Sequence, residues 1–362
     1  MANMNIRTPR FYCDYISYLL NRGVAQNTNF DVTATGGSGA TATRGLQSGT
    51  EAELFDMRPL NTCSFDTGGA IQSQVLVTLN MQSANPKQSF VAILNHNLAT
   101  AAGKIRVFAG DDASDVTAID GGNADTSDVN WGSVSVTESV NADSIATNAA
   151  SIAVQPATDG STIFTFPEQD LRYWGIQFEG TNSQTDVIST DGTWGADLTI
   201  GCIIIGEYFD MPVSPDLNVK RTIDFDGVTQ QKSIGGQIYS NMSRHGRTGS
   251  STSKSPFTTS SSDRHLYGGR LIYNMKFSYL NSTDLMPDEY LSKDFDDDAV
   301  VEDIWNITNG SHLPFIFSCD NTSLGNNAES EHIFARFAQD SLSMEQVAPD
   351  VFNVELKIQE EF

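Results

Sequence analysis

Apolar residues in this chain fall into short blocks that are rich in β-branched and aromatic side chains and bounded by Gly, Asn or Asp. That pattern is typical of β-strands. Two pairs of such blocks lie far apart, at residues 89–98 and 103–110 and again at residues 173–178 and 198–209. Because the polar stretch between the two pairs can supply little core, the pairs must pack on each other. The expected arrangement is a jelly-roll-like β-sandwich.

A second strand-rich region follows residues 211–216, where two prolines disfavour a helix and stiffen the chain. Asp226 and Gly227 predict a hairpin turn between two of its strands. An acidic start, one apolar face and the following Gly310 predict a single helix near residues 298–309. The strands expected here are residues 217–225, 228–234, 237–240, 271–280, 313–318, 331–338 and 351–359. The fold class is therefore mainly β, a jelly-roll-like β-sandwich followed by a second β-sandwich with one flanking helix.

These patterns divide the chain into three parts. Residues 1–60 are expected to form an N-terminal helix and an extended arm, residues 61–212 the first sandwich, and residues 213–362 the second. The second sandwich carries the helix near 298–309 and a Ser/Thr-rich insertion at 245–264 that is too polar to build a core. Such an insertion is flexible in isolation.

Two segments are candidates for contact between subunits. Residues 11–22 place aromatic side chains at helix-like spacing, and Gly23 can close that helix. So many aromatic groups on one short element should pack on the body of the protein or on another subunit. The insertion is either a solvent loop or a basic arm that clamps an acidic neighbouring copy. The candidate contact residues are Phe11, Tyr12, Tyr15, Tyr18, Arg244, Arg247, Lys254 and Arg264.

Charge and composition narrow the possible partners. The 362 residues carry a formal net charge of −24, which repels nucleic-acid phosphates and argues against nucleic-acid binding. This charge serves solubility or attracts a basic partner or a divalent cation. No apolar run approaches the ~20 residues of a membrane span, and no secretory signal is expected at the N-terminus. The four cysteines are widely spaced, which favours free thiols in a reducing cytoplasm and leaves two disulfides as the alternative.

Catalytic motifs are missing from the sequence. It contains no Gly-x-Ser-x-Gly elbow, no phosphate-binding loop and no His-Glu-x-x-His pair, so no enzyme activity and no cofactor is expected. His96 ends a predicted strand and is expected to cap a turn. Residues 110–115 could place oxygens around a loop-bound calcium ion. Trp131 and Trp194 could form a sugar-stacking face, whereas Trp174 is expected in the core.

Three stretches carry a resemblance to a known class of protein. Residues 90–98 followed by 105–108 are similar to discoidin-like (galactose-binding-like) modules, and residues 206–212 resemble the exit from such a module. The order of strand, helix, Pro-Phe strand and acidic final strand between residues 271 and 361 resembles tail-tube-like domains. Together these stretches cover about half of the chain. The chain thus resembles a bacteriophage virion protein of the tail or tail-tip kind.

The resemblance implies a repeated, non-catalytic subunit in a ring or sleeve. It implies location in the virion tail or baseplate after assembly in the bacterial cytoplasm, with copies of itself and other virion proteins as partners. It transfers no sugar-binding or metal-binding residue. The alternatives are a carbohydrate-binding adhesin that recognises a host-surface glycan, a capsid decoration or head-tail joining protein, and a secreted polysaccharide hydrolase.

Overall fold

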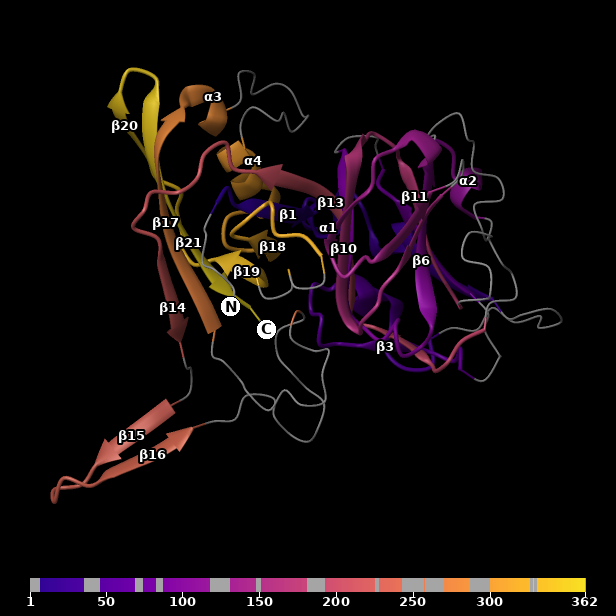
Figure 1. Cartoon of the computed structure of the whole chain (residues 1–362), viewed down its shortest axis with the longest axis horizontal. Helices are drawn as coiled ribbons and strands as arrows, with labels where there is room; N and C mark the ends of the chain where they lie inside the picture. The colour runs from indigo at the N-terminus through magenta and orange to yellow at the C-terminus, as the bar shows by residue number, and fades with distance from the viewer. Residues whose placement is uncertain are drawn as a thin grey trace.

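The computed structural model describes residues 7–35, 46–68, 74–82, 87–117, 131–147, 151–180, 193–224, 228–242, 257, 270–286, 300–325, 328 and 331–361. The fold is mainly β, with about 50% of the described residues in strands and several antiparallel sheets, which confirms the mainly β part of the prediction. Figure 1 shows two lobes side by side, an N-terminal lobe around β6, β10 and β11 and a C-terminal lobe around β17, β19 and β21. A thin hairpin projects from the C-terminal lobe.

Four sheets contain the strands. The largest has 11 strands in the order β14 (Lys220–Asp224), β17 (Arg270–Asn281), β21 (Val351–Glu360), β19 (His332–Phe337), β18 (Phe315–Ser318), β1 (Arg10–Asp14), β13 (Cys202–Asp210), β5 (Gln88–His96), β10 (Gly160–Gln169) and β7 (Thr137–Val140), with β20 (Met344–Ala348) paired to β21. The second has six, in the order β2 (Phe30–Thr35), β4 (Gln74–Asn80), β11 (Tyr173–Gly180), β6 (Gly103–Gly110), β9 (Ile152–Gln155) and β8 (Ser144–Thr147). Two small sheets pair β12 (Leu198–Ile200) with β3 (Cys63–Phe65) and β15 (Val228–Lys232) with β16 (Ile238–Met242).

Helices are short and lie against the sheets. The α-helices are α1 (Tyr15–Asn21), α2 (Ser114–Thr117), α3 (Ser282–Leu285) and α4 (Val300–Ile307), and the 3-10 turns include η1 (Asn27–Asn29), η2 (Glu51–Phe55) and η4 (Trp131–Ser133). The α4 helix confirms the helix expected near residues 298–309, but α3 is a second helix in the region where one was expected. None of the helices in the described ranges is long and apolar enough to cross a membrane.

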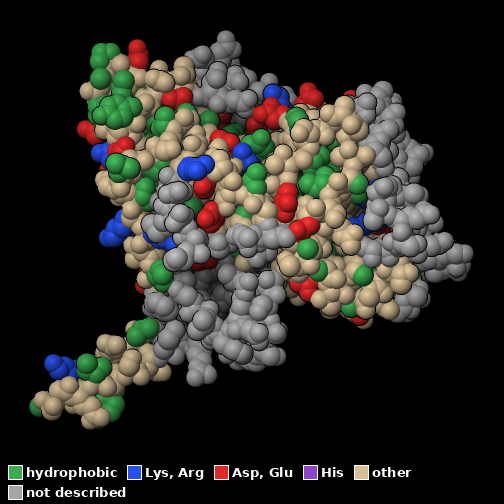
Figure 2. Space-filling view, viewed as in Figure 1, with side chains coloured by type: hydrophobic (Ala, Val, Ile, Leu, Met, Phe, Trp, Pro, Cys, Tyr) green, Lys and Arg blue, Asp and Glu red, His purple; other side chains and the backbone are tan. Residues whose placement is uncertain are grey.

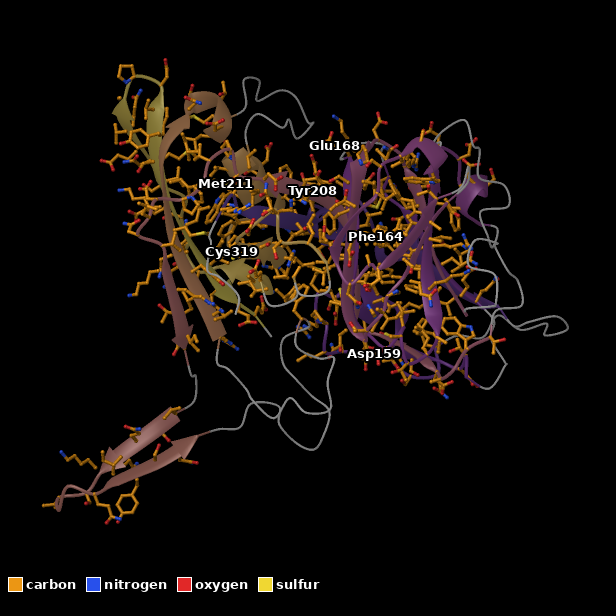
Figure 3. All side chains as sticks on the ribbon, viewed as in Figure 1. Asp159, Phe164, Glu168, Tyr208, Met211 and Cys319 are labelled. Atoms are coloured by element: carbon orange, nitrogen blue, oxygen red, sulfur yellow. The ribbon has the colours of Figure 1, made fainter. Side chains whose placement is uncertain are left out.

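The core of the N-terminal lobe lies between two layers of strands. Trp174, Ile176 and Phe178 on β11 belong to the same buried cluster as Val91 on β5 and Phe164 on β10. Figure 3 shows Phe164 between the layers, in a densely filled interior. The alternation of buried apolar side chains along β11 is the period-2 pattern of a strand, which explains why these residues form one.

Strand β1 joins the two lobes. It pairs antiparallel with β13 through Phe11↔Phe209 and with β18 through Phe11↔Phe317. The N-terminal segment is therefore a central strand followed by a helix, and the helix expected over residues 11–22 begins only at Tyr15. Asp14 caps that helix, because its carboxylate accepts the backbone N–H of Ser17 at 2.8 Å. Gly23 follows the helix with a φ of +69°, as expected of a closing glycine.

Two predicted details of the strand pattern are wrong. The block at residues 198–209 is split at Gly201, where a Cβ would lie 2.0 Å from the Pro59 carbonyl oxygen, so its two parts join different sheets. Asp226 and Gly227 lie outside the described residues, but the strands on either side of them do not pair with each other, because β14 pairs with β17 while β15 pairs with β16. The turn that reverses the chain lies at Gly236 instead, which has a φ of +88°.

Candidate interaction site

The hairpin β15–β16, residues 228–242, is named here the arm. Its strands pair with each other from Val228↔Met242 to Lys232↔Ile238 and with no other strand of the described residues. The turn is closed by the Ser233 N–H, which donates to the Gln237 carbonyl at 2.8 Å. Figures 1 and 3 show the arm and its side chains standing clear of the body. The arm is thus a local structure that no other described strand supports.

Apolar side chains are concentrated on the arm. It carries four of the eleven exposed large hydrophobic residues in the described chain, and the side chain of Ile234 at its tip is fully exposed. The four are Val228, Ile234, Ile238 and Tyr239. An isolated two-stranded hairpin is only marginally stable in water. An element that combines free strand edges with exposed apolar groups is suited to contact with another polypeptide.

A second apolar surface lies at the far end of the same lobe. Tyr279 stands in a bulge of β17 with a φ of +68° and is 78% exposed, and Val347 stands in a bulge of β20 and is 50% exposed. Leu217 is fully exposed beside β17, where the preceding Asp216 donates its N–H to the Lys276 carbonyl at 2.8 Å. Figure 2 shows hydrophobic side chains gathered at this end. Tyr279 and Val347 are named here the β20 patch.

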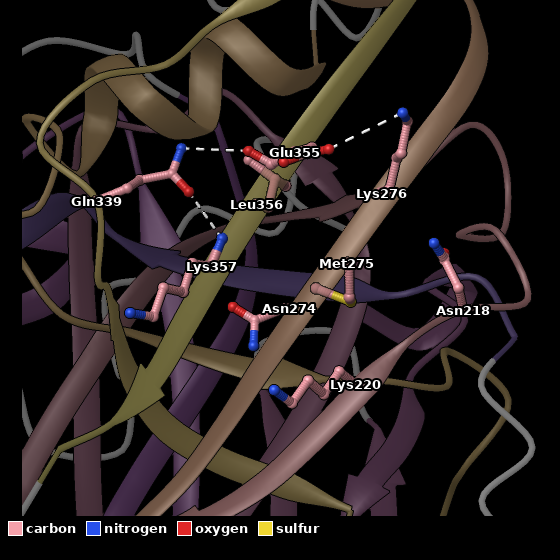
Figure 4. Close-up of a pocket in the computed structure, with 9 residues that line it drawn as sticks. All are labelled: Asn218, Lys220, Asn274, Met275, Lys276, Gln339, Glu355, Leu356 and Lys357. Atoms are coloured by element: carbon pink, nitrogen blue, oxygen red, sulfur yellow. Dashed lines mark hydrogen bonds and ion pairs between the residues drawn. The ribbon is translucent and has the colours of Figure 1, made fainter.

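A hollow of about 320 Å³ opens on the outer face of β14, β17 and β21 (Figure 4). Lys220 and Lys357 flank Asn274 in one cross-strand row, and neither lysine has an ion-pair partner among the described residues. The side chain of Gln339 stabilises the floor, because its Oε1 accepts the Lys357 N–H at 2.7 Å. Two neighbouring ammonium groups without an ion-pair partner among the described residues can attract carboxylates of an acidic surface.

Lys276 completes the charged rim of the hollow. Its ammonium group lies 3.9 Å from Glu355, an exposed pair that contributes little stability. The hollow is lined by Asn218, Lys220, Asn274, Met275, Lys276, Gln339, Glu355, Leu356 and Lys357. On a chain with a net charge of −24, this is a local positive surface.

The structure places three of the predicted N-terminal contact residues in the interior. Phe11, Tyr12 and Tyr15 are at most 1% exposed, and the Tyr15 hydroxyl donates to Glu207 at 2.5 Å. Burial raises the pKa of Tyr15 well above its ordinary value. In this fold the three side chains offer no surface to another subunit. Tyr18 is partly buried and packs on the same core.

The four cations proposed as contact residues lie outside the described residues. They are Arg244, Arg247, Lys254 and Arg264. Within the insertion, the structure describes Phe257, which is buried and lies 6.0 Å from the His332 ring, measured between ring centroids.

The tryptophans expected to stack on a sugar are buried. Trp131 is 1% exposed and lies edge-on to Trp174 with ring centroids 6.2 Å apart, and Trp194 is 7% exposed. Neither provides an open aromatic face, so the predicted sugar platform at Trp131 and Trp194 is wrong. Trp174 lies in the core as expected, where its indole N–H donates to the Leu171 carbonyl at 2.9 Å.

The His96 side chain forms hydrogen bonds that stabilise the turn after β5. The Leu98 N–H donates to its Nδ1 at 3.2 Å, so the ring proton resides on Nε2, which donates to the Thr162 hydroxyl at 2.8 Å. Burial lowers the pKa of His96 to about 4. The neutral ring thereby supports the turn after β5, which confirms its expected structural role.

The loop at residues 110–115 offers no set of ligands for calcium. The Asp115 carboxylate accepts the Asp112 N–H at 3.0 Å, and the described residues contain no group of three or more His, Cys, Asp or Glu side chains that could hold a metal ion. All four cysteines are buried free thiols. The structure thus agrees with the free thiols that the wide cysteine spacing favours.

A buried charge cluster lies on β6 and β11. The Glu179 carboxylate lies 2.8 Å from the Lys104 ammonium nitrogen and 2.7 Å from the Arg106 Nε, and forms an ion pair with each. All three side chains are at most 3% exposed. Their charges are paired and inaccessible, so the arrangement serves the sheet and cannot reach a dissolved substrate.

Comparison with known proteins gives no relative. No family model matches the chain, and neither the curated proteins nor the solved structures contain a significant match. The arm, the β20 patch and the lysine-lined hollow are therefore the features on which a functional proposal depends.

Proposed function

We propose that this protein is a structural subunit of a bacteriophage virion, of the tail, tail-tip or baseplate kind, which acts through ring-like oligomeric assembly. The observation that carries the proposal is the arm, an exposed hairpin with apolar side chains and two edges that no other described strand pairs with. Contact with copies of itself or other virion proteins would bury those groups. The sequence resemblance to tail proteins supplies the biological setting, a virion assembled in the bacterial cytoplasm.

The fold supports a scaffolding role. We interpret the N-terminal lobe as a jelly-roll-like, discoidin-like β-sandwich and the C-terminal lobe as a tail-tube-like β-sandwich with α4 at its side. Strand β1 pairs with both β13 and β18, so the two lobes share one continuous sheet. A subunit that transmits load through a particle benefits from such continuity, because the lobes cannot separate without breaking backbone hydrogen bonds.

The alternatives differ in what they predict for the particle. A capsid decoration or head-tail joining protein would also assemble through the arm, and immunogold labelling of particles would place it on the head or at the neck. The adhesin hypothesis relied on sugar stacking by Trp131 and Trp194, and both side chains are buried. For the hydrolase hypothesis, the sequence singles out no carboxylate pair among its 45 acidic residues.

The arm can be tested with one substitution at its tip. Ile234→Asp puts a charge on the fully exposed tip residue without touching the core. Wild-type protein should form large oligomers in sedimentation velocity and electron micrographs, and Ile234→Asp should remain smaller. Val24→Asp is the matched control, because Val24 is a 53% exposed β-branched residue on the body. A wild-type protein that stays monomeric at high concentration and is absent from particles would contradict the proposal.

A further inference from the structure

We infer that the arm of one copy docks on the β20 patch of the next copy, adding its strands to the free edge of β20, so that assembly is head-to-tail. This inference rests on the proposed assembly function and names the partner surface of the arm.

Strand geometry supports the pairing. β20 hydrogen-bonds to β21 along one edge, and no other described strand pairs with it. Its side chains are mostly exposed, and it has the same number of residues, 5, as β15 and as β16. An extended edge with unpaired N–H and C=O groups is a template for an added strand. Either arm strand is therefore long enough to pair along the whole of β20.

Charge complementarity favours the same partner. Residues 228–262 contain no Asp or Glu, although the chain has 45 acidic residues, and the arm itself carries Lys232. The edge it would meet is acidic, with Glu345 on β20 and Asp350 in the turn that follows. On a chain of this net charge, most surfaces of two copies repel each other. A cationic arm against an acidic edge is a contact at which they attract.

Apolar groups are available on both sides of the contact. Ile234 and Tyr239 on the arm are 110% and 59% exposed, and Val347 on β20 is 50% exposed. Burying these groups against each other removes apolar surface from water on both copies. This gives the contact a driving force that salt does not screen.

Position determines the symmetry. Figure 1 shows the arm and β20 at opposite ends of the long strands β17 and β21. β17 has 12 residues and so extends about 40 Å at ~3.4 Å per residue. One copy therefore cannot dock its own arm on its own patch. A contact between two different surfaces is heterologous, and it repeats until the rotation between copies closes a ring or extends a filament.

The test uses two variants that are each defective on one side. Ile234→Asp damages the arm, and Val347→Asp damages the patch. Each variant alone should need about 30-fold or more protein to assemble, because transfer of one large apolar side chain from water contributes at that level. Their equimolar mixture should form dimers and nothing larger, since only one arm and one patch remain intact in each pair.

A disulfide experiment gives an independent result. The native cysteines are buried, so mixed Ile234→Cys and Val347→Cys proteins should form a crosslinked dimer under mild oxidation, and neither variant should form one alone. Crosslinking of Ile234→Cys by itself would show that arms meet arms and would overturn the inference. Normal assembly of Val347→Asp would also overturn it.

The two proposals fail in distinguishable ways. If wild-type protein assembles but the mixture yields no dimer while both variants keep wild-type circular dichroism, only the head-to-tail inference fails. If wild-type protein itself never assembles, the proposed function fails.

Discussion

Strand β1 should hold the two lobes in one cooperative unit, and Phe11 is the side chain to test. Phe11 is fully buried, and its ring lies 5.4 Å from Phe315 and 5.2 Å from Phe317, measured between centroids. It also contacts Phe337 at 6.2 Å. Replacing a buried Phe by Ala costs about 3–5 kcal/mol, and the loss of these ring contacts places the expected cost for Phe11→Ala at about 4 kcal/mol.

That cost is a large share of the ~5–15 kcal/mol by which folded domains are stable. Because the ring packs on β18 and β19 while its backbone pairs with β13, its removal should weaken the C-terminal lobe and its connection to the N-terminal lobe. In urea, circular dichroism reports both lobes, whereas tryptophan fluorescence reports mainly the N-terminal lobe, which contains Trp131, Trp174 and Trp194. The two probes should give one transition in the wild type and separate transitions in Phe11→Ala.

Phe178→Ala is the matched control for this experiment. Phe178 is an equally buried aromatic residue on β11, in the sheet that β1 does not join. It should lower stability by a similar amount and move the fluorescence transition at least as far as the circular dichroism transition. The reasoning is refuted if Phe11→Ala costs less than about 1 kcal/mol, or if wild-type protein already unfolds in two separate steps.

Three further predictions concern buried groups. Burial lowers the pKa values of His96 and His332 to about 4, so on acidification the unfolded chain binds these protons before the folded chain does. The free energy of unfolding should therefore fall by about 3 kcal/mol per histidine between pH ~6.5 and ~4. Urea titrations at both pH values should show a smaller fall for His96→Gln than for the wild type. Glu179→Ala leaves two buried cations without their carboxylate and should lower the free energy of unfolding, measured in urea, by about 3–5 kcal/mol. Removing the exposed Lys87 side chain should lower it by less than about 1 kcal/mol. Equal losses in the two variants would contradict the importance of the buried ion pairs. Gly206→Ala should lower the free energy of unfolding by about 3 kcal/mol, because the added Cβ would lie 2.0 Å from a carbonyl oxygen of β1. An unchanged melting temperature would show that β1 does not pair with β13 at this position.

Local patterns in the sequence determined most of the strands and the longest helix. The alternating blocks at residues 173–178 and 271–280 became β11 and β17, and the apolar face near residues 298–309 became α4. These predictions succeed because period-2 and period-3.6 patterns are properties of neighbouring residues. The mainly β class follows from them directly.

The interaction site is harder to find from sequence. The residues of the arm were expected to form two strands of the second sandwich. One local signal was available, namely the absence of carboxylates from residues 228–262 in so acidic a chain. That signal marks the segment as unusual, but it does not show that the hairpin stands clear of the body.

The sequence by itself determined where strands form and which of their faces are apolar. The tertiary structure alone decided that β1 pairs with β13 and β18, that the aromatic N-terminal segment is interior, and that the arm has no neighbour among the described strands. The physical reason is that alternation sets the conformation and orientation of a strand, whereas its partner depends on contacts between residues hundreds of positions apart, such as Phe11 and Phe317.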